Sequence, residues 1–477
     1  MRQAGKGARS VAVVGGGWAG CAAAVALARG RCRVTLFEAS RTLGGRARRV
    51  DSDGRALDNG QHILLGAYRD SLALLKRLGV ARGAALLTLP LQMRYAPGAG
   101  GMDFVAPRLP APLHLFGALL RATGLAREDK LSLARFSTTA RWMGWRLHDD
   151  CSVSTLLERF EQTPRLIQLM WRPLCLAALN TPPERASAQV FLNVLRDSLG
   201  AGRSASDMLL PRTDLSALLP DAAAAYVLRH GGAVHMGVKV GALARAGAQW
   251  RVEHNGDNPD DTTLFDGVVV ATGWHGAASL LRTLADDDDK LHATEAAALA
   301  ATCAQLDAFD AEAITTCYLQ YGPDVRLAQP FFALIDDPEQ GHWGQFVFDR
   351  GQLIETAPTT SQGIGQRGLL AVVVSASAAA SAQGQAALVQ AVASQLAHVF
   401  GRAEFAQPLW TKVISEKRAT YACAPGLARP ANATILDGLV LAGDYTADAD
   451  PLRRYPATLE GAVRSGNAAA RLLGGRP

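Results

Sequence analysis

The first forty residues contain a strand, a glycine-rich turn, a helix and a second strand in immediate succession. Four apolar residues at 11–14 predict a buried strand, and the turn at 15–20 has the spacing G-x-G-x-x-G. Residues 21–29 are rich in alanine and predict a helix, and residues 34–37 predict the second strand. This unit is typical of the nucleotide-binding half of a doubly wound sheet.

The small and acidic residues of this unit each have a physical task. Gly15 permits the tight turn, Gly17 lets the backbone approach a pyrophosphate, and Gly20 lets the helix pack closely on the strand. The N-terminus of the helix faces the anion. Glu38 follows Gly20 by eighteen residues, which suits a carboxylate that accepts hydrogen bonds from ribose hydroxyls. An ordinary glycine-rich turn is the alternative interpretation.

A second match to the same spacing, at 363–368, lacks this context. It follows a polar run at 359–362 and precedes an apolar strand at 369–374, so no helix begins after the glycines. We therefore predict a loop there. Because the chain then keeps a single nucleotide fingerprint, the sequence identifies no electron donor.

The composition predicts a globular protein with more than one domain. The chain has 477 residues, of which 49% are hydrophobic and 19% charged, and its formal net charge is +6. A chain of this length favours two or three domains. No dense Lys/Arg cluster with interleaved aromatic residues is present, so nucleic acid is not an expected partner, whereas a weak affinity for anionic membrane surfaces stays open.

The cysteines indicate a reducing compartment. They are odd in number, scattered and without a C-x-x-C pair: Cys21, Cys32, Cys151, Cys175, Cys303, Cys317 and Cys423. We expect neither a disulfide framework nor a metal site. The first strand begins too early for a signal peptide, and no apolar run of about 18 residues predicts a transmembrane helix. We expect a cytoplasmic protein, soluble or peripheral on the inner face of the membrane.

Later apolar runs predict how the nucleotide fold is completed. Strands are expected at 231–236 and 267–273, and a buried strand at 439–444 precedes a helix that opens at 456–463. We predict an α/β fold in which a Rossmann-like domain, assembled from both chain ends, holds an inserted α+β substrate domain. The predicted segments of the nucleotide domain are 1–85, 229–280 and 429–477, and those of the substrate domain are 86–228 and 281–428.

The two substrate-domain segments differ in pattern. Residues 86–228 are mostly helical and apolar, whereas 314–374 contain alternating strands, including one at 344–348. The acidic run at 286–290 is expected to be a solvated loop rather than a metal site.

The motifs follow the order of a known superfamily. Gly-Gly-Arg at 44–46 comes after Glu38, the strand at 268–273 ends in Ala-Thr-Gly, and Gly-Asp at 443–444 closes the last strand. With the glycine turn, they resemble the FAD-dependent amine oxidase and phytoene desaturase superfamily over nearly the whole chain. The resemblance implies a flavin-binding Rossmann-like domain and a substrate domain with a mixed sheet and helices.

Further motifs resemble a narrower family. They are Asp-Asn-Gly-Gln-His at 58–62, Trp-Arg-Pro-Leu at 171–174, Ala-Leu-Asn-Thr at 178–181 and the segment 456–466. Together they are similar to the squalene-associated flavoenzymes of bacterial hopanoid pathways, the hydroxysqualene dehydroxylases. The activity implied is reductive removal of an allylic hydroxyl to give squalene, and the implied substrate is a polyisoprenoid small molecule.

The resemblance also assigns cofactor-binding positions. It implies that Gly15, Gly17 and Gly20 lie on the FAD diphosphate and Glu38 on the adenosine ribose. It further places Gly45 and Arg46 near the phosphates, Val240 on the adenine side, Gly443 and Asp444 at the ribityl chain or diphosphate, and the backbone N–H of Leu459 at the flavin ring. The cysteine motif of covalent attachment is missing before Gly443, so we expect non-covalent FAD.

Removal of an allylic hydroxyl needs a proton, a stabilised allylic cation and a hydride, which reduced flavin supplies. His62 is the first candidate for the acid because its motif lies over the flavin in this superfamily; a structural histidine is the alternative. Asp58 is a weaker candidate, since a carboxylate at a turn commonly caps backbone N–H groups. Aromatic candidates for an apolar tunnel wall, or for the core, are Trp142, Trp145, Trp171, Phe331, Phe332 and Trp343.

Two other classes of function stay open. An oxidative carotenoid or phytoene desaturase would share the fold, the FAD and a polyisoprenoid tunnel, and would send the hydride to the flavin. The motifs at 58–62 and 456–466 favour the dehydroxylase. A non-catalytic protein with a flavin-binding fold is the third class.

One segment is a candidate for membrane contact. Residues 109–120 carry no Asp, Glu, Lys or Arg, and Arg108 and Arg121 flank them. A long hydrocarbon substrate partitions into lipid, so we expect this segment to touch the membrane surface. A buried helix of the substrate domain is the alternative.

Overall fold

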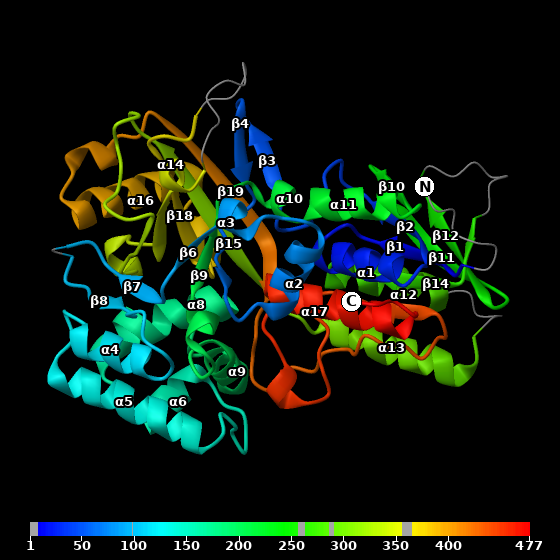
Figure 1. Ribbon diagram of the computed structural model, residues 1–477, viewed down its shortest axis with the longest axis horizontal. Helices are drawn as coiled ribbons and strands as arrows, with labels where there is room; N and C mark the ends of the chain where they lie inside the picture. The colour runs from blue at the N-terminus through cyan, green and yellow to red at the C-terminus, as the bar shows by residue number, and fades with distance from the viewer. Residues whose placement is uncertain (1–7, 98, 256–262, 286–290, 355–364) are drawn as a thin grey trace.

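The computed structural model describes residues 8–97, 99–255, 263–285, 291–354 and 365–477. The predicted loop at 286–290 and the first residues of the second glycine match, 363–364, lie outside these ranges. Figure 1 shows a parallel sheet on the right, an antiparallel sheet on the left and a group of helices below the latter. Both chain ends lie on the side of the parallel sheet.

The N-terminal unit consists of β1 (Ser10–Val14), α1 (Trp18–Arg29) and β2 (Arg33–Glu38), as the sequence predicts. The helix begins at Trp18 rather than at residue 21, because Gly17 is extended, with ψ of 179°, and serves as the N-cap. Strand β1 is buried on both faces. Val11 and Val13 pack in the same cluster as α1, whereas Ala12 and Val14 pack in the cluster on the opposite face.

Strands from distant parts of the chain complete this sheet. Its order is β10-β2-β1-β14-β20, and every neighbouring pair is parallel. The added strands are β10 (Ala233–Met236), β14 (Gly267–Val270) and β20 (Leu439–Leu441). The prediction that the nucleotide fold is assembled from both chain ends is therefore confirmed.

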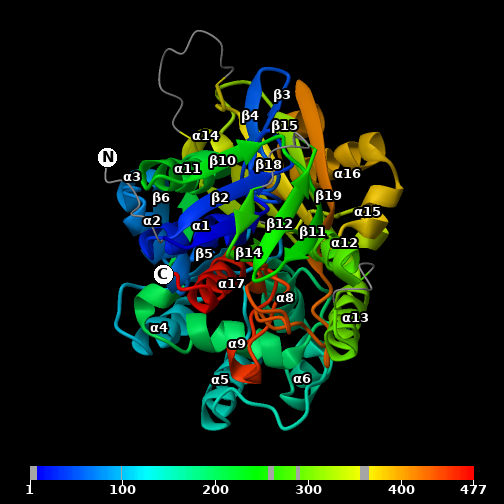
Figure 2. The ribbon, with the colours of Figure 1, turned by 90° about the vertical axis from the view of Figure 1, so that its right-hand side faces the viewer.

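Helices α1 and α17 (Leu459–Leu472) lie side by side on one face of the sheet (Figures 1 and 2). Their contact requires a glycine, because a Cβ at Gly466 would lie 2.1 Å from the carbonyl oxygen of Ala19. The other face is covered by a three-stranded antiparallel sheet. Its strands are β11 (Val240–Ala246), β12 (Gln249–His254) and β13 (Leu264–Phe265), and α12 (Trp274–Ala285) and α13 (Ala293–Asp307) lie beside them.

The second large sheet has the order β16-β17-β18-β15-β19. Its strands are β15 (Ala311–Gln320), β16 (Phe331–Ala333), β17 (Phe346–Asp349), β18 (Leu369–Ser375) and β19 (Trp410–Tyr421). All its pairings are antiparallel, whereas a mixed sheet was expected. The pairs β16-β17 and β17-β18 join strands that are consecutive in the chain, and consecutive strands can pair antiparallel without the long crossover that a parallel pair needs. Residues 365–368 form the loop and turn before β18, as predicted.

Helix α16 (Gln385–Phe400) covers the outer face of this sheet. Leu388, Val392 and Leu396 of the helix pack in one cluster with Leu319 of β15 and Val372 of β18. The inner face is left for the interior of the molecule. The sheet is therefore a wall with one covered face and one face available to a ligand.

The helical region contains α4 (Leu113–Arg121), α5 (Arg127–Trp142), α6 (Val153–Arg159), α7 (Pro164–Leu166), α8 (Arg172–Leu179) and α9 (Ala188–Ser198), with a π-helical turn at Ile167–Trp171. None of the helices in the described ranges is both long and apolar enough to cross a membrane. The predicted domain limits at 85, 228, 280 and 428 stay a prediction.

The helical prediction for 86–228 missed several short strands. They are β6 (Leu86–Leu89), β7 (Gln92–Arg94), β8 (Asp103–Val105) and β9 (Met208–Pro211). β9 pairs with β6 and with β5 (Leu64–Leu65). Apolar runs this short have no period that separates strand from helix, so only the pairing partner reveals them. The remaining elements are β3 (Arg49–Ser52), β4 (Arg55–Asp58), α2 (Arg69–Arg77), α3 (Arg82–Ala85), α10 (Leu215–Leu218), α11 (Pro220–Arg229), α14 (Arg350–Leu353) and α15 (Ala378–Ala382).

Candidate functional site

A cavity of about 970 Å³ extends from the parallel sheet to the helical region. At one end it is lined by Gly15, Glu38 and Gly443, which lie at or just after the carboxyl ends of β1, β2 and β20. At the other end it is lined by residues of α4 and α5. Carboxyl ends of parallel strands are the usual ligand-binding edge of such a sheet.

The glycine turn (residues 15–20) has the geometry that its sequence predicts. Gly15 has φ of +109°, and a Cβ there would lie 2.6 Å from the carbonyl oxygen of Ala271. A Cβ at Gly20 would lie 1.9 Å from the carbonyl oxygen of Gly15. Gly15 and Gly17 line the cavity, and Gly20 does not. The place of Gly20 is therefore between helix and strand, away from a ligand.

A second glycine segment lies against the first. The N–H of Gly44 donates to the carbonyl oxygen of Gly16 at 2.8 Å. Gly45 has φ of +61°, and a Cβ on it would lie 3.2 Å from the Cα of Gly17. The first turn of α1 contains no acidic residue and its N-cap has no side-chain hydrogen bond. Bare backbone at a helix N-terminus fits a diphosphate group.

Glu38 lies at the rim of this turn with both carboxylate oxygens in use. Oε2 accepts from the N–H of Gly16 and Oε1 from the N–H of Ser40, each at 2.7 Å. Each oxygen keeps a further lone pair, and the residue lines the cavity. Val240, the first residue of β11, lines the same end. The arrangement fits a ribose between a carboxylate and an apolar adenine pocket.

Arg46 and Asp444 meet across the cavity wall although they are 398 residues apart in the chain. Nη2 of Arg46 lies 2.7 Å from Oδ1 of Asp444, whose side chain is 7% exposed. Nη1 of Arg46 donates to the carbonyl oxygen of Ala419 at 2.6 Å. Both residues line the cavity, as does Gly443. The ion pair thus joins the N-terminal and C-terminal parts of the nucleotide fold.

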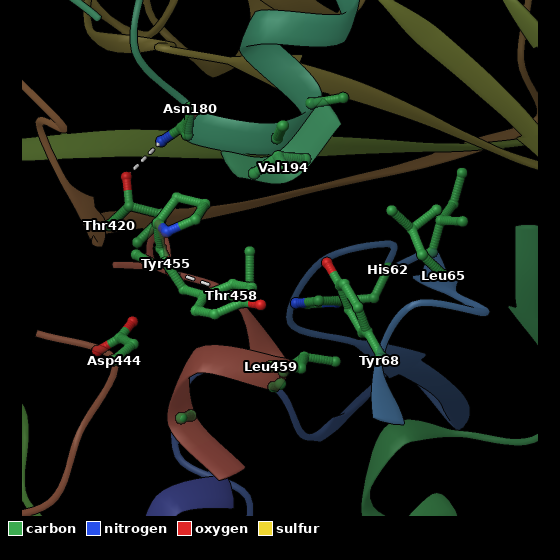
Figure 3. A pocket seen from close by; sticks show the side chains of 18 of the residues that line it. His62, Leu65, Tyr68, Asn180, Val194, Thr420, Asp444, Tyr455, Thr458 and Leu459 are labelled. Carbon is green, nitrogen blue, oxygen red and sulfur yellow. Dashed lines mark hydrogen bonds between the residues drawn. The ribbon is translucent and has the colours of Figure 1, made fainter. Parts of the chain in front are cut away.

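Helix α17 directs its N-terminus at the middle of the cavity. Its N-cap Thr458 accepts from the N–H of Gly461 at 3.1 Å, and Leu459 is its first residue. Thr458 and Leu459 line the cavity opposite His62 and Tyr68 (Figure 3). An electron-rich ring edge placed here would meet free backbone donors and the positive end of a helix dipole.

His62 lines the middle of the cavity and points toward the side formed by Tyr455 and Thr458 (Figure 3). Its Nδ1 lies 2.9 Å from the carbonyl oxygen of Gly60. Burial is the main reason that the pKa of His62 lies below its usual value of 6.5. The ring is therefore neutral at pH 7, with Nδ1–H donating to Gly60 and Nε2 left as an acceptor.

Asp58, the second predicted catalytic residue, does not line the cavity. Its Oδ2 lies 2.8 Å from Nη1 of Arg350, and its Oδ1 accepts from the N–H of Leu215 at 2.8 Å. Both charged side chains are buried, at 2% and 1% exposure. The same Arg350 nitrogen donates to Oε1 of Gln61 at 3.0 Å. This geometry makes Asp58 an anchor of the 58–62 loop rather than a group that reaches a ligand.

The far part of the cavity is apolar. Trp171 and Phe136 lie with ring centroids 4.5 Å apart, and the N–H of Trp171 donates to Oε1 of Gln162 at 2.9 Å. Of the six aromatic candidates, Trp145 and Trp171 line the cavity, whereas Trp142, Phe331, Phe332 and Trp343 do not. Trp142 is 89% exposed, and Phe331 is 1% exposed in the core. Aromatic wall residues that the sequence did not single out are Phe104, Phe116, Phe136, Phe346 and Phe348.

A small polar group borders the apolar part. Nδ2 of Asn180 donates to Oγ1 of Thr420 at 3.0 Å (Figure 3). Asn180 ends α8 in a left-handed conformation with φ of 48°, which asparagine tolerates. Tyr68, Asn180, Thr420 and Tyr455 line the cavity and were missed as site residues. The predicted motif at 178–181 contains Asn180, but nothing in the sequence alone marks its side chain as facing a ligand.

Solved structures show the same fold. An oxidoreductase from Methanosarcina mazei aligns with a TM-score of 0.70 at 15% sequence identity, covering 97% of this chain and 100% of that one. The arrangement of the two sheets and the helical region is therefore shared with a known oxidoreductase.

Sequence relatives extend over the whole chain. A hydroxysqualene dehydroxylase of Rhodopseudomonas palustris is 28% identical over 98% of both chains. Another, of Sinorhizobium fredii, is 26% identical over 97% of this chain and 98% of the relative. A zeta-carotene desaturase of Synechocystis sp. is 24% identical over 97% of this chain and 96% of the relative.

The family itself is shown by a match that covers almost the entire chain. Residues 18–473 match the family described as flavin containing amine oxidoreductase. This match includes α1, α17, the whole antiparallel sheet and every strand of the parallel sheet except β1. The chain therefore belongs to the flavin containing amine oxidoreductase family and is a flavin-dependent oxidoreductase.

Proposed function

We propose that this protein is an FAD-dependent hydroxysqualene dehydroxylase, which removes an allylic hydroxyl reductively to give squalene. The observation that carries the proposal is that one continuous cavity joins the glycine turn to an apolar chamber. A chamber with aromatic walls and few polar groups suits a long hydrocarbon with one hydroxyl. The relatives with this name align over nearly their full length.

FAD fits the nucleotide end of the cavity. Gly15, Gly17 and Gly45 offer bare backbone to a diphosphate, and Glu38 and Val240 suit the adenosine. Arg46, Gly443, Asp444 and Leu459 are the remaining residues that would hold it. When bound and reduced, the flavin supplies a hydride equivalent.

The residues of the chain have three tasks in such a reaction. The C–O bond breaks as the hydroxyl takes a proton and leaves as water, and a new C–H bond forms at the allylic carbon. We assign the proton to His62, because it is a titratable side chain at the middle of the cavity. Trp171 and Phe136 can face an allylic cation with their rings, and the apolar walls exclude water.

The similarity to a zeta-carotene desaturase favours a second candidate, oxidative desaturation of a polyisoprenoid. Both candidates require the same flavin and an apolar chamber. They differ in the direction of the hydride, and a non-catalytic flavin-binding protein would transfer none.

The direction is tested under anaerobic conditions with chemically reduced protein. We expect reduced protein to convert hydroxysqualene into squalene and to regain its yellow colour, whereas oxidised protein gives no squalene. The physical reason is that the side chains of the chain include no hydride donor. Product is measured by gas chromatography and colour by absorbance. Desaturation of a carotene by oxidised protein would support the second candidate, and no turnover in either state would support the third.

Non-covalent binding predicts that acid precipitation releases the flavin into the supernatant. None of the seven cysteines, all of which are described, lines the cavity. Cys423, the cysteine closest in sequence to Gly443, is buried, and burial raises the pKa of its thiol to about 12. A thiol in that state is a poor nucleophile. Absorbance of pellet and supernatant measures the outcome, and yellow colour kept in the washed pellet would contradict it.

A further inference from the structure

Exposed apolar side chains gather in one region of the surface. Among the described residues, twelve large apolar side chains are exposed, and six of them fall between residues 109 and 142. These six are called the apolar rim: Leu109 (40% exposed), Leu113 (53%), Phe116 (49%), Leu120 (77%), Leu131 (70%) and Trp142 (89%). An exposed cluster of this kind marks a surface that meets another apolar phase.

The rim residues occupy consistent faces of two helices. Leu113, Phe116 and Leu120 recur on α4 at intervals of three and four, which places them on one face. The residues of α4 that are buried are His114 and Ala118, so the alternative of a helix buried on all sides is wrong. On α5, Leu131 and Trp142 are eleven residues apart, about three full turns, and share a face.

Residues of both helices form part of the cavity wall. Leu115, Phe116 and Leu119 of α4 line it, and so do Thr138 and Arg141 of α5. Phe116 is a wall residue of the cavity and is at the same time half exposed. Thr138 shares the helix face of Leu131 and Trp142. The apolar rim and the wall of the apolar chamber therefore meet at Phe116.

Positive charge is concentrated in the same segment of the chain. Residues 108–146 contain seven Lys and Arg against two Asp and Glu, a net charge of +5 in a chain whose total is +6. Six of the seven side chains are exposed: Arg108, Arg121, Arg127, Arg135, Arg141 and Arg146. Exposed apolar side chains and exposed guanidinium groups in one segment match the interface of an anionic bilayer, where hydrocarbon lies beneath phosphate.

We propose that the apolar rim docks on an anionic phospholipid bilayer, and that the apolar chamber opens onto lipid between α4 and α5. The occupant is a membrane because both properties of this segment match it: exposed apolar side chains and an excess of exposed cations. That the substrate enters by this route rests on the function proposed above, since a polyisoprenoid resides in the bilayer. Docking itself does not depend on which reaction follows.

The test is flotation of the purified full-length protein with vesicles. We expect the protein to float with phosphatidylglycerol–phosphatidylcholine vesicles, less with phosphatidylcholine alone, and less again in high salt, since each cation near an anionic surface contributes about fivefold. Leu113→Glu plus Leu120→Glu changes the outward face of α4 without touching the cavity wall. This variant should bind anionic vesicles at least tenfold more weakly.

The matched control is Leu409→Glu plus Leu472→Glu, which changes two exposed leucines (76% and 52%) outside the apolar rim and should float as the wild type. Circular dichroism and flavin content check that each variant is folded. Undiminished flotation of the rim variant would overturn the proposal, as would a wild type that floats with neither vesicle. A protein partner at this surface would give the latter result.

Turnover rates distinguish a failure of the docking proposal from a failure of the proposed reaction. With substrate in vesicles the rim variant should be at least tenfold slower than the wild type, and with substrate in detergent micelles the two should be equal. A protein that floats as expected but turns over no hydroxysqualene would leave the docking intact and refute the proposed reaction. Equal slowing in vesicles and micelles would show damage to the cavity and would count against a docking role.

Discussion

His62→Ala should slow squalene formation by about 10²–10⁴-fold, the usual contribution of a positioned acid, while the flavin stays bound. The imidazole lies at the middle of the cavity, and its Nδ1 is tied to the carbonyl oxygen of Gly60 at 2.9 Å. That bond orients the ring and leaves Nε2 as the atom that can hold and deliver a proton. Single-turnover kinetics with reduced protein measure the rate.

The pH dependence of the rate gives the same residue a second readout. Because burial holds the pKa of His62 below 6.5, only a minor fraction of the ring carries a proton at pH 7. The rate should therefore rise as the pH falls through that lowered pKa, and His62→Gln should remove the rise. His275→Ala is the matched control, since His275 also lines the cavity and has a lowered pKa. A pH profile unchanged by His62→Gln would return His62 to a structural role.

Arg350→Met should lower the free energy of unfolding by about 3–5 kcal/mol, measured by urea denaturation. The substitution leaves the Asp58 carboxylate buried, at 2% exposure, without its cation partner. It also removes the hydrogen bond from Nη1 to Gln61, next to His62. We therefore expect a loss of activity in the folded fraction as well, because the loop that presents His62 loses its anchor.

A surface pair provides the comparison for this variant. Arg135 and Glu161 are 57% and 70% exposed, so Arg135→Met should change stability by about 0–1 kcal/mol. Asp58→Leu combined with Arg350→Met removes both charges and should cost less than the sum of the single changes. Equal costs for Arg350→Met and Arg135→Met, or additive costs for the double variant, would contradict the assigned role of the pair.

The nucleotide half could be predicted because its signals are local. Strand, turn, helix and second strand follow one another between Ser10 and Glu38, and two of the three fingerprint glycines are required by close contacts. Gly15 and Gly20 show this directly, since a Cβ on either would collide with a carbonyl oxygen. A succession of elements with required glycines leaves a pattern in the sequence, and this pattern predicts the unit.

The middle of the site could not be predicted in the same way. Asp58 and Arg350 are 292 residues apart, and neither position shows which partner the other has. A carboxylate beside a candidate acid resembles a second catalytic group until its cation is seen. The aromatic wall has the same difficulty: Trp171 faces the cavity and Phe331 the core, although each has an apolar neighbour in the sequence.

The pairing of the two chain ends has a consequence for synthesis on the ribosome. Asp444, the partner of Arg46, and the whole of α17, which packs on α1, emerge long after the N-terminal unit, since 398 residues separate Arg46 from Asp444. Until then β14 lacks its neighbour β20, and the cavity lacks the wall residues Gly443, Asp444 and Leu459. Domains generally fold as units once their chain is available. We therefore expect a nascent chain that stops before residue 439 to bind no flavin, although its N-terminal strand–turn–helix–strand unit has already been synthesised.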